Sequence, residues 1–120
     1  MKFGLSEKTI QKINSIFATH PQVEKAVIFG SRAKGNYKNG SDIDLTLHGR
    51  ELTAKLLRKI EVELDDLLLP YKIDISIFDQ ISNPEFVGHI LRVGLVFYEK
   101  KISGDNKSGS KKLKIGKLKS

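Results

Sequence analysis

The sequence predicts a small α/β (α+β) domain, in which helices pack on one face of a small mixed β-sheet. Three stretches carry apolar residues at helical spacing, and two others alternate strictly between apolar and polar residues. Together with two short apolar runs, these patterns follow the chain in the order α-β-β-α-β-α-β. A chain of 120 residues has room for one domain of this kind.

The N-terminal part predicts one helix and one buried strand. Apolar residues recur at helical spacing over residues 6–19, where Ser6 is a typical N-cap and Pro21 follows the end. The short apolar run 26–29 ends at Gly30, which is typical of a buried strand that leads into a turn.

The middle of the chain predicts two strands with a helix between them. Residues 42–48 and 71–78 alternate between apolar and polar side chains, so each strand has one apolar and one polar face. A stripe of Leu and Ile over 52–68 predicts the helix, which stops before Pro70.

The last elements are a third helix and an edge strand. The order Asn83-Pro84-Glu85, a cap followed by proline and an acid, predicts the start of a helix that runs to Gly94. Residues 95–98 are apolar and aromatic, and they predict a final strand at one edge of the sheet.

The positive charge of the chain is concentrated at its C-terminal end. The net charge is +7, but residues 1–100 contain 14 Lys and Arg against 13 Asp and Glu, whereas residues 101–120 contain 7 Lys against one Asp. We predict a nearly neutral domain at 1–100 and a basic, flexible tail at 101–120. Nucleic-acid binding is not expected of the domain. The tail either only solubilises the protein or makes a weak, salt-sensitive contact with RNA, DNA or an acidic partner.

Composition excludes several classes of protein. No apolar run approaches the roughly 18 residues that a bilayer requires, so no membrane partner is expected. The first residues lack the apolar core of a secretory signal, and the absence of cysteine rules out disulfides and thiolate metal sites. These features fit a cytoplasmic protein.

A glycine–serine pair marks the first motif of interest, Gly30-Ser31-Arg32-Ala33-Lys34-Gly35. A glycine directly after a strand lets backbone N–H groups approach an anion, and a serine hydroxyl adds another donor. A Gly-Ser pair alone is more often a plain turn than a phosphate site. Its neighbour in the sequence, Ser41-Asp42-Ile43-Asp44-Leu45, strengthens the functional interpretation.

Three aspartates form the second feature. Asp42 and Asp44 leave the same face of their predicted strand, about 6.6 Å apart, and Asp74 joins that face if its strand pairs beside theirs. Like charges at about 5 Å repel by roughly 3 kcal/mol per pair at an effective dielectric constant of 20. The pattern therefore favours one or two divalent cations over simply solvated acids, and all-oxygen ligation suits Mg²⁺ or Mn²⁺.

Together the two motifs resemble the signature of a known superfamily. Gly30-Ser31, ten intervening residues and Asp42-Ile43-Asp44 are similar to the signature of the DNA polymerase β-type nucleotidyltransferases. The fuller run resembles the minimal nucleotidyltransferases of prokaryotes, the small partners of HEPN-domain ribonucleases in two-gene toxin–antitoxin modules. The resemblance covers about residues 5–100 and leaves out the tail, so it implies a nucleotidyltransferase domain at 1–100.

The resemblance implies phosphate contacts in the first motif. Gly30 and Ser31 would hold the β- and γ-phosphates of a nucleoside triphosphate. Arg32 and Lys34 are candidates for further phosphate contacts, with a solvated surface charge as the alternative for each.

The same resemblance assigns the three acids to metal binding and catalysis. Asp42 and Asp44 would ligate two Mg²⁺ ions, or Mn²⁺ in their place. Asp74, in Lys72-Ile73-Asp74-Ile75, matches the third acid, which ligates one metal and helps to deprotonate the attacking hydroxyl.

The implied function is transfer of a nucleoside monophosphate, AMP from ATP, to a hydroxyl of a HEPN toxin encoded by a neighbouring gene. The family points to a tyrosine acceptor and to neutralisation of the toxin, as in type VII-like antitoxins. About 100 ordered residues hold the phosphate and metal half of such a site only. The acceptor and part of the base pocket are therefore expected from another chain, in a hetero-oligomer.

Two alternatives remain open. The first is a non-catalytic antitoxin that neutralises its partner by complex formation, although a pure binder has no need of three clustered carboxylates. The second is a transferase that acts on RNA ends or on a small molecule. The near-neutral domain and the absence of a second domain weigh against it.

Overall fold

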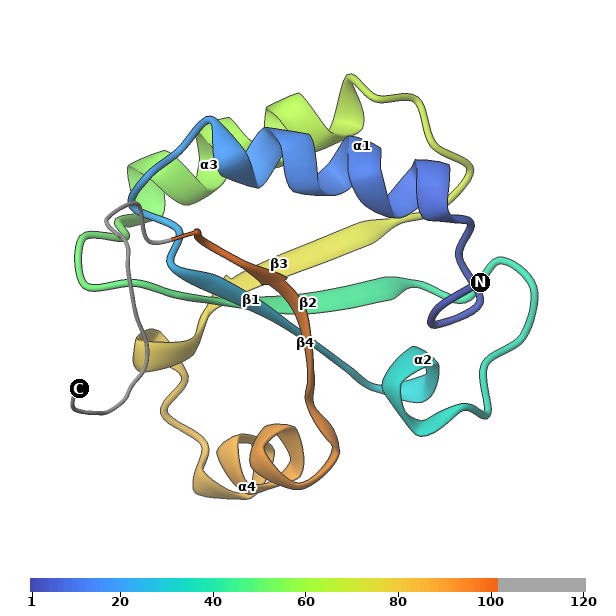
Figure 1. Cartoon of the computed structure of the whole chain (residues 1–120). Helices are drawn as coiled ribbons and strands as arrows, with labels where there is room; N and C mark the ends of the chain where they lie inside the picture. Colours follow the sequence, from blue (N-terminus) through green and yellow to red (C-terminus); the bar gives the residue numbers. More distant parts are fainter. Residues whose placement is uncertain (102–120) are drawn as a thin grey trace, which may run out of the picture.

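A computed structural model describes residues 1–101 of the chain. The expected basic tail at 101–120 lies outside the described residues, apart from Lys101. The elements are α1 (Glu7–Ala18), β1 (Lys25–Phe29), α2 (Ser31–Lys34), β2 (Ile43–His48), α3 (Ala54–Asp65), β3 (Ile73–Ile77), a short 3₁₀ helix (Phe78–Gln80), α4 (Pro84–Val93) and β4 (Leu95–Glu99) (Figure 1).

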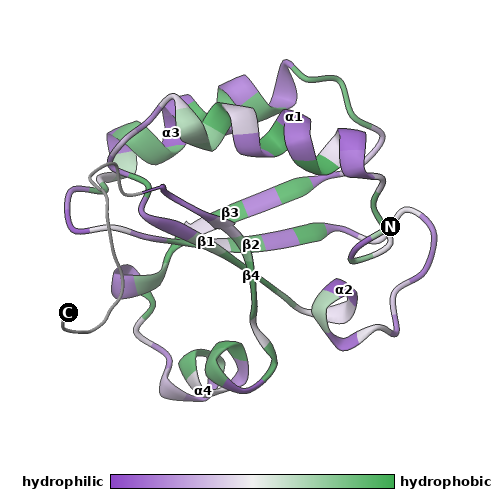
Figure 2. Cartoon of the chain, in the orientation of Figure 1, coloured by the Kyte–Doolittle hydropathy of each residue, from purple (hydrophilic) through white to green (hydrophobic). Residues whose placement is uncertain are grey.

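Within these residues, four strands form one mixed sheet in the order β3-β2-β1-β4. The pairs β1–β2 and β1–β4 are antiparallel, and the pair β2–β3 is parallel. Figure 2 shows hydrophobic and hydrophilic residues alternating along β2 and β3, as expected of strands with one buried face. The predicted α/β class with a small mixed sheet is confirmed, and so is the edge position of the last strand.

Local capping explains where the helices begin. Ser6 accepts a hydrogen bond from the Thr9 amide, and Thr53 caps α3 in the same way. The Asn83 side chain accepts from two amides of the first turn of α4, with Pro84 at the first helical position. The two caps predicted from the sequence, Ser6 and Asn83, are thus confirmed.

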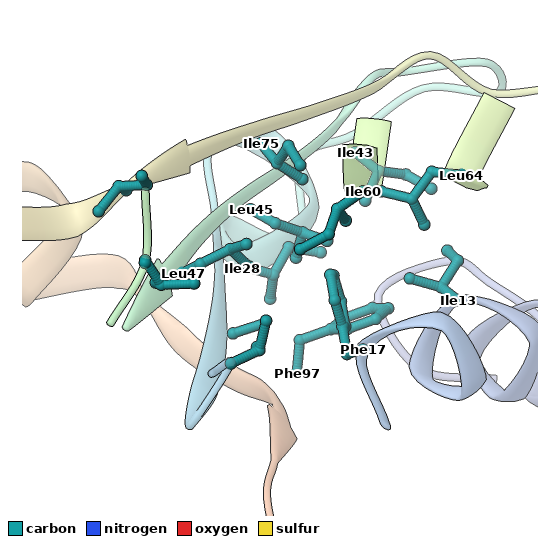
Figure 3. Close-up of a cluster of buried hydrophobic side chains, with 14 of the residues drawn as sticks. Ile13, Phe17, Ile28, Ile43, Leu45, Leu47, Ile60, Leu64, Ile75 and Phe97 are labelled. Atoms are coloured by element: carbon teal, nitrogen blue, oxygen red, sulfur yellow. The ribbon is translucent and has the colours of Figure 1, made fainter. Parts of the chain in front are cut away.

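One face of the sheet carries the main hydrophobic core. Helices α1 and α3 lie side by side over this face (Figure 1). The alternate residues of β2 that point toward them, Ile43, Leu45 and Leu47, are fully buried. Figure 3 shows how the side chains of the two helices and the sheet meet in this layer, with Ile13, Phe17, Ile60 and Leu64 coming from the helices.

Helix α4 differs from the prediction that helices pack on one face. It lies on the opposite side of the sheet from α1 and α3 (Figure 1). Its Phe86 packs edge-to-face on Phe29 of β1, with ring centroids 5.4 Å apart, and its Ile90 is buried. The physical reason is that β1 is apolar on both faces, so Val27 and Phe29 need a cover on the second face.

The short helix α2 was not predicted. Its four residues are too few for a periodic pattern, and it ends at Gly35, whose φ of +85° gives a left-handed cap. None of the helices in the described part of the chain has the length and apolar character that crossing a bilayer requires.

Candidate active site

Two of the predicted acids lie directly side by side. The parallel register between β2 and β3 pairs Asp44 with Asp74, so their Cα atoms are neighbours across about 4.8 Å of the sheet. Asp42 comes two residues before Asp44 and is exposed on the same face. This is the face opposite to the α1–α3 core. The structure therefore meets the condition on which the sequence argument depended, that the strand of Asp74 pairs beside that of Asp44.

The electrostatics of Asp44 show that the charges interact. Burial raises the pKa of the Asp44 carboxyl above its ordinary value, and the negative charges of Asp74 and Asp42 raise it further. Lys72 acts in the opposite direction, and its Nζ lies 3.8 Å from an oxygen of Asp74. The ionised form of Asp44 is thus disfavoured by its surroundings, and a cation between the carboxylates would relieve that cost.

The Gly30–Ser31 turn lies against the same carboxylate. In the register of β1 and β2, Phe29 is the partner of Asp44, so the turn leaves the sheet beside this acid. Gly30 has φ +76° and ψ −155°, a conformation open to glycine and strained for other residues. A methyl group added at Gly30 would lie 2.7 Å from Oδ2 of Asp44. The turn and the acid therefore approach each other as closely as a glycine permits.

Ser31 and Lys34 take different positions on α2. Ser31 is the first residue of the helix and directly follows the strained Gly30. Lys34 is exposed in the last turn, where its ammonium is free to reach a ligand or solvent. Both placements are compatible with the phosphate contacts that the sequence motif suggests.

Arg32 is placed differently from either expectation. It is only 3% exposed, so it is not a solvated surface charge. Its guanidinium hydrogen-bonds the backbone carbonyls of Phe3 and Ser41, and phosphate binding would require these bonds to break. This arrangement does not favour the predicted phosphate contact at Arg32, because its donors are engaged by backbone carbonyls of the same chain.

Two further residues lie on the polar face: Lys72, which was not singled out from the sequence, and His48, which could face the site but is, at a strand end, more often a surface histidine. Lys72 belongs to the alternating strand that carries Asp74, which is the only signal that could have found it. His48 stacks on Phe78 with ring centroids 4.5 Å apart. Burial lowers the pKa of His48, the charge of Lys25 lowers it further, and Asp79 opposes them.

The chemistry of the acids fits a hard divalent cation, although the structure does not present a preformed cage. Within residues 1–101, no three carboxylate or imidazole side chains converge as a metal centre. Asp42, Asp44 and Asp74 nevertheless supply only oxygen donors on one face, and the pKa of Asp44 is raised by its burial and, to a smaller extent, by the charges of Asp74 and Asp42. This donor set suits Mg²⁺ or Mn²⁺.

The fold and these motifs define a nucleotidyltransferase domain, and the comparisons agree. The family model described as "Polymerase beta, Nucleotidyltransferase" matches residues 11–103, so the chain belongs to that family. A search of curated proteins finds no match.

Several solved structures with a similar fold are toxin–antitoxin complexes. A chain in the crystal structure of a toxin–antitoxin with AMP-PNP has a TM-score of 0.62 and 19% identity, over 81% of this chain and 76% of that chain. A chain of the MntA–HepT toxin–antitoxin has a TM-score of 0.60 and 15% identity, over 79% and 74%. The complex of a tri-AMPylated Shewanella oneidensis HEPN toxin with its MNT antitoxin gives 0.60 and 15%, over 80% and 74%. At these identities the likeness establishes the fold.

Proposed function

We propose that this protein transfers AMP from ATP to a tyrosine hydroxyl of a HEPN-domain toxin and so acts as its antitoxin. The observation that carries the proposal is the close approach of three elements on one face of the sheet: Gly30 against the Asp44 carboxylate, and Asp44 beside Asp74. The toxin–antitoxin complexes with a similar fold, one with AMP-PNP and one with an AMPylated HEPN toxin, support the choice of nucleotide and partner.

The turn and α2 are proposed to hold the triphosphate. The backbone at Gly30 and the hydroxyl of Ser31 would donate to the β- and γ-phosphates, and the exposed ammonium of Lys34 would neutralise part of their charge. Because Gly30 lies against Asp44, a triphosphate held at the turn would have its α-phosphate near the acids. Transfer requires this proximity.

The acids are proposed to hold Mg²⁺ and to handle the acceptor proton. Asp42 and Asp44 would bind two Mg²⁺ ions, with Asp74 as a ligand of one of them. When bound, the ions would stabilise the attacking and leaving oxygens of an in-line displacement at the α-phosphate. Asp74 is exposed and lies beside Asp44, so it is placed to accept the proton of an incoming hydroxyl. The products would be the nucleotidylated protein and pyrophosphate.

The acceptor is proposed to come from a second chain in a hetero-oligomer. Asp42 and Asp74 are exposed, and Asp44 is half-buried, so the polar face is open to a partner on the side of the acids. In this arrangement the domain supplies phosphate and metal binding, and the toxin supplies the tyrosine.

Intact-mass spectrometry of the partner tests the proposal. The HEPN-domain protein encoded by the neighbouring gene is incubated with this protein, Mg²⁺ and each of the four NTPs in turn. We expect a gain of one or more AMP groups with ATP. No gain is expected with the Asp42→Asn/Asp44→Asn variant. Asp66→Asn, which removes an exposed acid at the end of α3, is the matched control and should leave transfer intact.

The same experiment separates the alternatives. A partner that stays unmodified but still co-purifies and is still inhibited would favour an antitoxin that acts by complex formation. A mass gain on RNA or on a small molecule, with none on the HEPN protein, would overturn the proposed acceptor while leaving the transferase class in place.

A further inference from the structure

The side chain of Arg32 is buried among backbone carbonyls and aromatic rings. Its Nε and Nη2 both donate to the Ser41 carbonyl, at 3.0 and 2.9 Å, and its Nη1 donates to the Phe3 carbonyl at 2.9 Å. The guanidinium carbon lies 5.2 Å from the ring centroid of Tyr37 and 4.9 Å from that of Tyr71. The side chain therefore uses its three nitrogens and its planar faces within the protein.

Arg32 and two of its partners, Ser41 and Tyr71, lie in or next to the segments that carry the predicted site residues. Arg32 follows Ser31 on α2, and the Ser41 carbonyl directly precedes Asp42. Tyr71 lies three residues before Asp74, at the entry to β3. One buried side chain thus connects the phosphate-binding turn, the loop that leads into β2 and the approach to β3.

Besides Arg32, a backbone hydrogen bond from the Asn36 amide to the Ser31 carbonyl (3.2 Å) ties the start of the loop between α2 and β2 to the helix. Gly35 and Gly40 both have positive φ, so the loop turns sharply at each end. Ser41 closes a turn with Lys38: its amide donates to the Lys38 carbonyl, and its hydroxyl accepts from the Lys38 amide. That turn holds the loop together internally, whereas the two hydrogen bonds from Arg32 to the Ser41 carbonyl attach it to α2.

We propose that Arg32 is a positioning residue, which sets the distance between the Gly30–Ser31 turn and the acids of β2. This inference rests on the proposed nucleotidyl transfer. In-line attack requires the α-phosphate to sit at the acids while the β- and γ-phosphates are held at the turn. A misplacement of about 1 Å between such groups costs on the order of 100-fold in rate. Arg32 acts through Ser41 and Tyr71 and does not touch the nucleotide.

Lysine cannot replace arginine in this role. A guanidinium donates two parallel bonds to one carbonyl, a third to another carbonyl, and stacks on two rings at once. An ammonium on a flexible stem retains the charge but not this geometry. Arg32→Lys therefore separates a positioning role from a phosphate contact, since a simple charge at a phosphate would be largely preserved.

The first test measures kcat for transfer and Kd for Mg-ATP in Arg32→Lys. We expect kcat to fall about 10- to 100-fold while Kd changes less than about threefold. Tyr37→Leu removes one ring, leaves the three hydrogen bonds in place and affects a partly exposed residue, so it should fold and show a smaller loss of kcat. A Kd that weakens at least as much as kcat falls would identify a phosphate contact and overturn the inference.

The second test needs no activity. Hydrogen exchange of peptides covering residues 36–44 should accelerate at least about tenfold in Arg32→Lys, while the α1–α3 core remains protected. His20→Ala is the control. It removes a buried contact with Glu63 (2.7 Å), and His20 precedes the start of β1, whereas the Gly30–Ser31 turn follows its end. It should lower stability without selective exchange at 36–44. Uniform acceleration in Arg32→Lys would indicate global destabilisation and overturn the positioning role.

The outcomes also separate this inference from the proposed function. If the unaltered protein transfers no nucleotide to any acceptor, the proposed function fails, and the catalytic consequence of Arg32 fails with it. If the unaltered protein transfers AMP and Arg32→Lys has an unchanged kcat, only the inference about Arg32 is overturned.

Discussion

Replacement of Gly30 by alanine should damage both the fold and the site, and the structure gives the size of the effect. At φ +76° and ψ −155°, an alanine would be in a region that costs about 1–3 kcal/mol. Its Cβ would also lie 2.7 Å from Oδ2 of Asp44, closer than real contacts allow, so the carboxylate must move. We expect a loss of about 2–4 kcal/mol in the free energy of unfolding, and a Tm lowered by at least about 8 °C.

The two contributions can be separated by a double-mutant cycle in chemical denaturation. In an Asp44→Ala background the carboxylate is absent, so Gly30→Ala should cost only the backbone strain, and the coupling should reach about 1 kcal/mol. Gly35→Ala is the matched control, because its φ is also positive but no atom lies within 4 Å of the added methyl. It should cost about 1–2 kcal/mol and leave nucleotide transfer intact.

Because the added methyl would displace the Asp44 carboxylate, the Gly30→Ala variant should also transfer nucleotide at least about tenfold more slowly than the unaltered protein. Two results would refute the reasoning. One is an equal cost of Gly30→Ala with and without Asp44, which would mean that the methyl does not meet the carboxylate. The other is a cost no larger than that of Gly35→Ala, which would mean that the turn relaxes freely.

Two further predictions concern polar groups on the same face. In metal-free buffer, Asp44→Asn should raise Tm at pH 7, because the folded state holds the pKa of Asp44 above its ordinary value of 3.8. The unaltered protein therefore loses stability as the pH rises through that raised pKa, and the two Tm values should converge below about pH 4. Since Asp44 is half-exposed, the gain should be below about 1 kcal/mol, and a lower Tm for the variant at pH 7 in thermal scans would contradict it. Thr46→Val should raise the denaturation midpoint by the equivalent of about 1 kcal/mol, because Thr46 is fully buried and its hydroxyl has no hydrogen-bond partner within residues 1–101. A loss of stability would show that the hydroxyl is bonded in solution.

Much of the fold could be predicted because its determinants are local. Alternation over 42–48 and 71–78 gave two strands, and the caps Ser6 and Asn83 gave the starts of two helices, since each signal lies within a few residues. The boundaries were less accurate. The stripe over 52–68 predicted a helix through the full run of leucines, whereas α3 spans Ala54–Asp65. After the end of α3, Leu67 and Leu69 pack against the core and Leu68 is exposed, but none of the three is helical. A periodic pattern of leucines does not distinguish such residues from helical ones.

The sequence predicted which face of each strand is polar, but not how strands and helices that are distant in the chain are arranged. The alternation placed Asp44 and Asp74 on the polar faces of their strands, but the parallel pairing that brings them together depends on the whole sheet. The position of α4 could not be predicted, because an amphipathic pattern identifies the apolar face of a helix and not the sheet face that it covers. The run 26–29 did carry a signal, since a strand that is apolar on both faces requires a cover on each.

Arg32 marks the limit of motif-based prediction at the site. Its place beside Ser31 suggested a phosphate contact, because spacing along the chain reports proximity and not the direction of a side chain. Its hydrogen-bond partners are the backbone carbonyls of Phe3 and Ser41. Every residue has such a carbonyl, so the residue type does not indicate which one accepts. The two tyrosines were visible in the sequence, yet Tyr71 is 39 positions away from Arg32. In the role proposed for Arg32, a basic residue of this motif would serve the site without touching the nucleotide, by fixing the backbone that carries the proposed ligands.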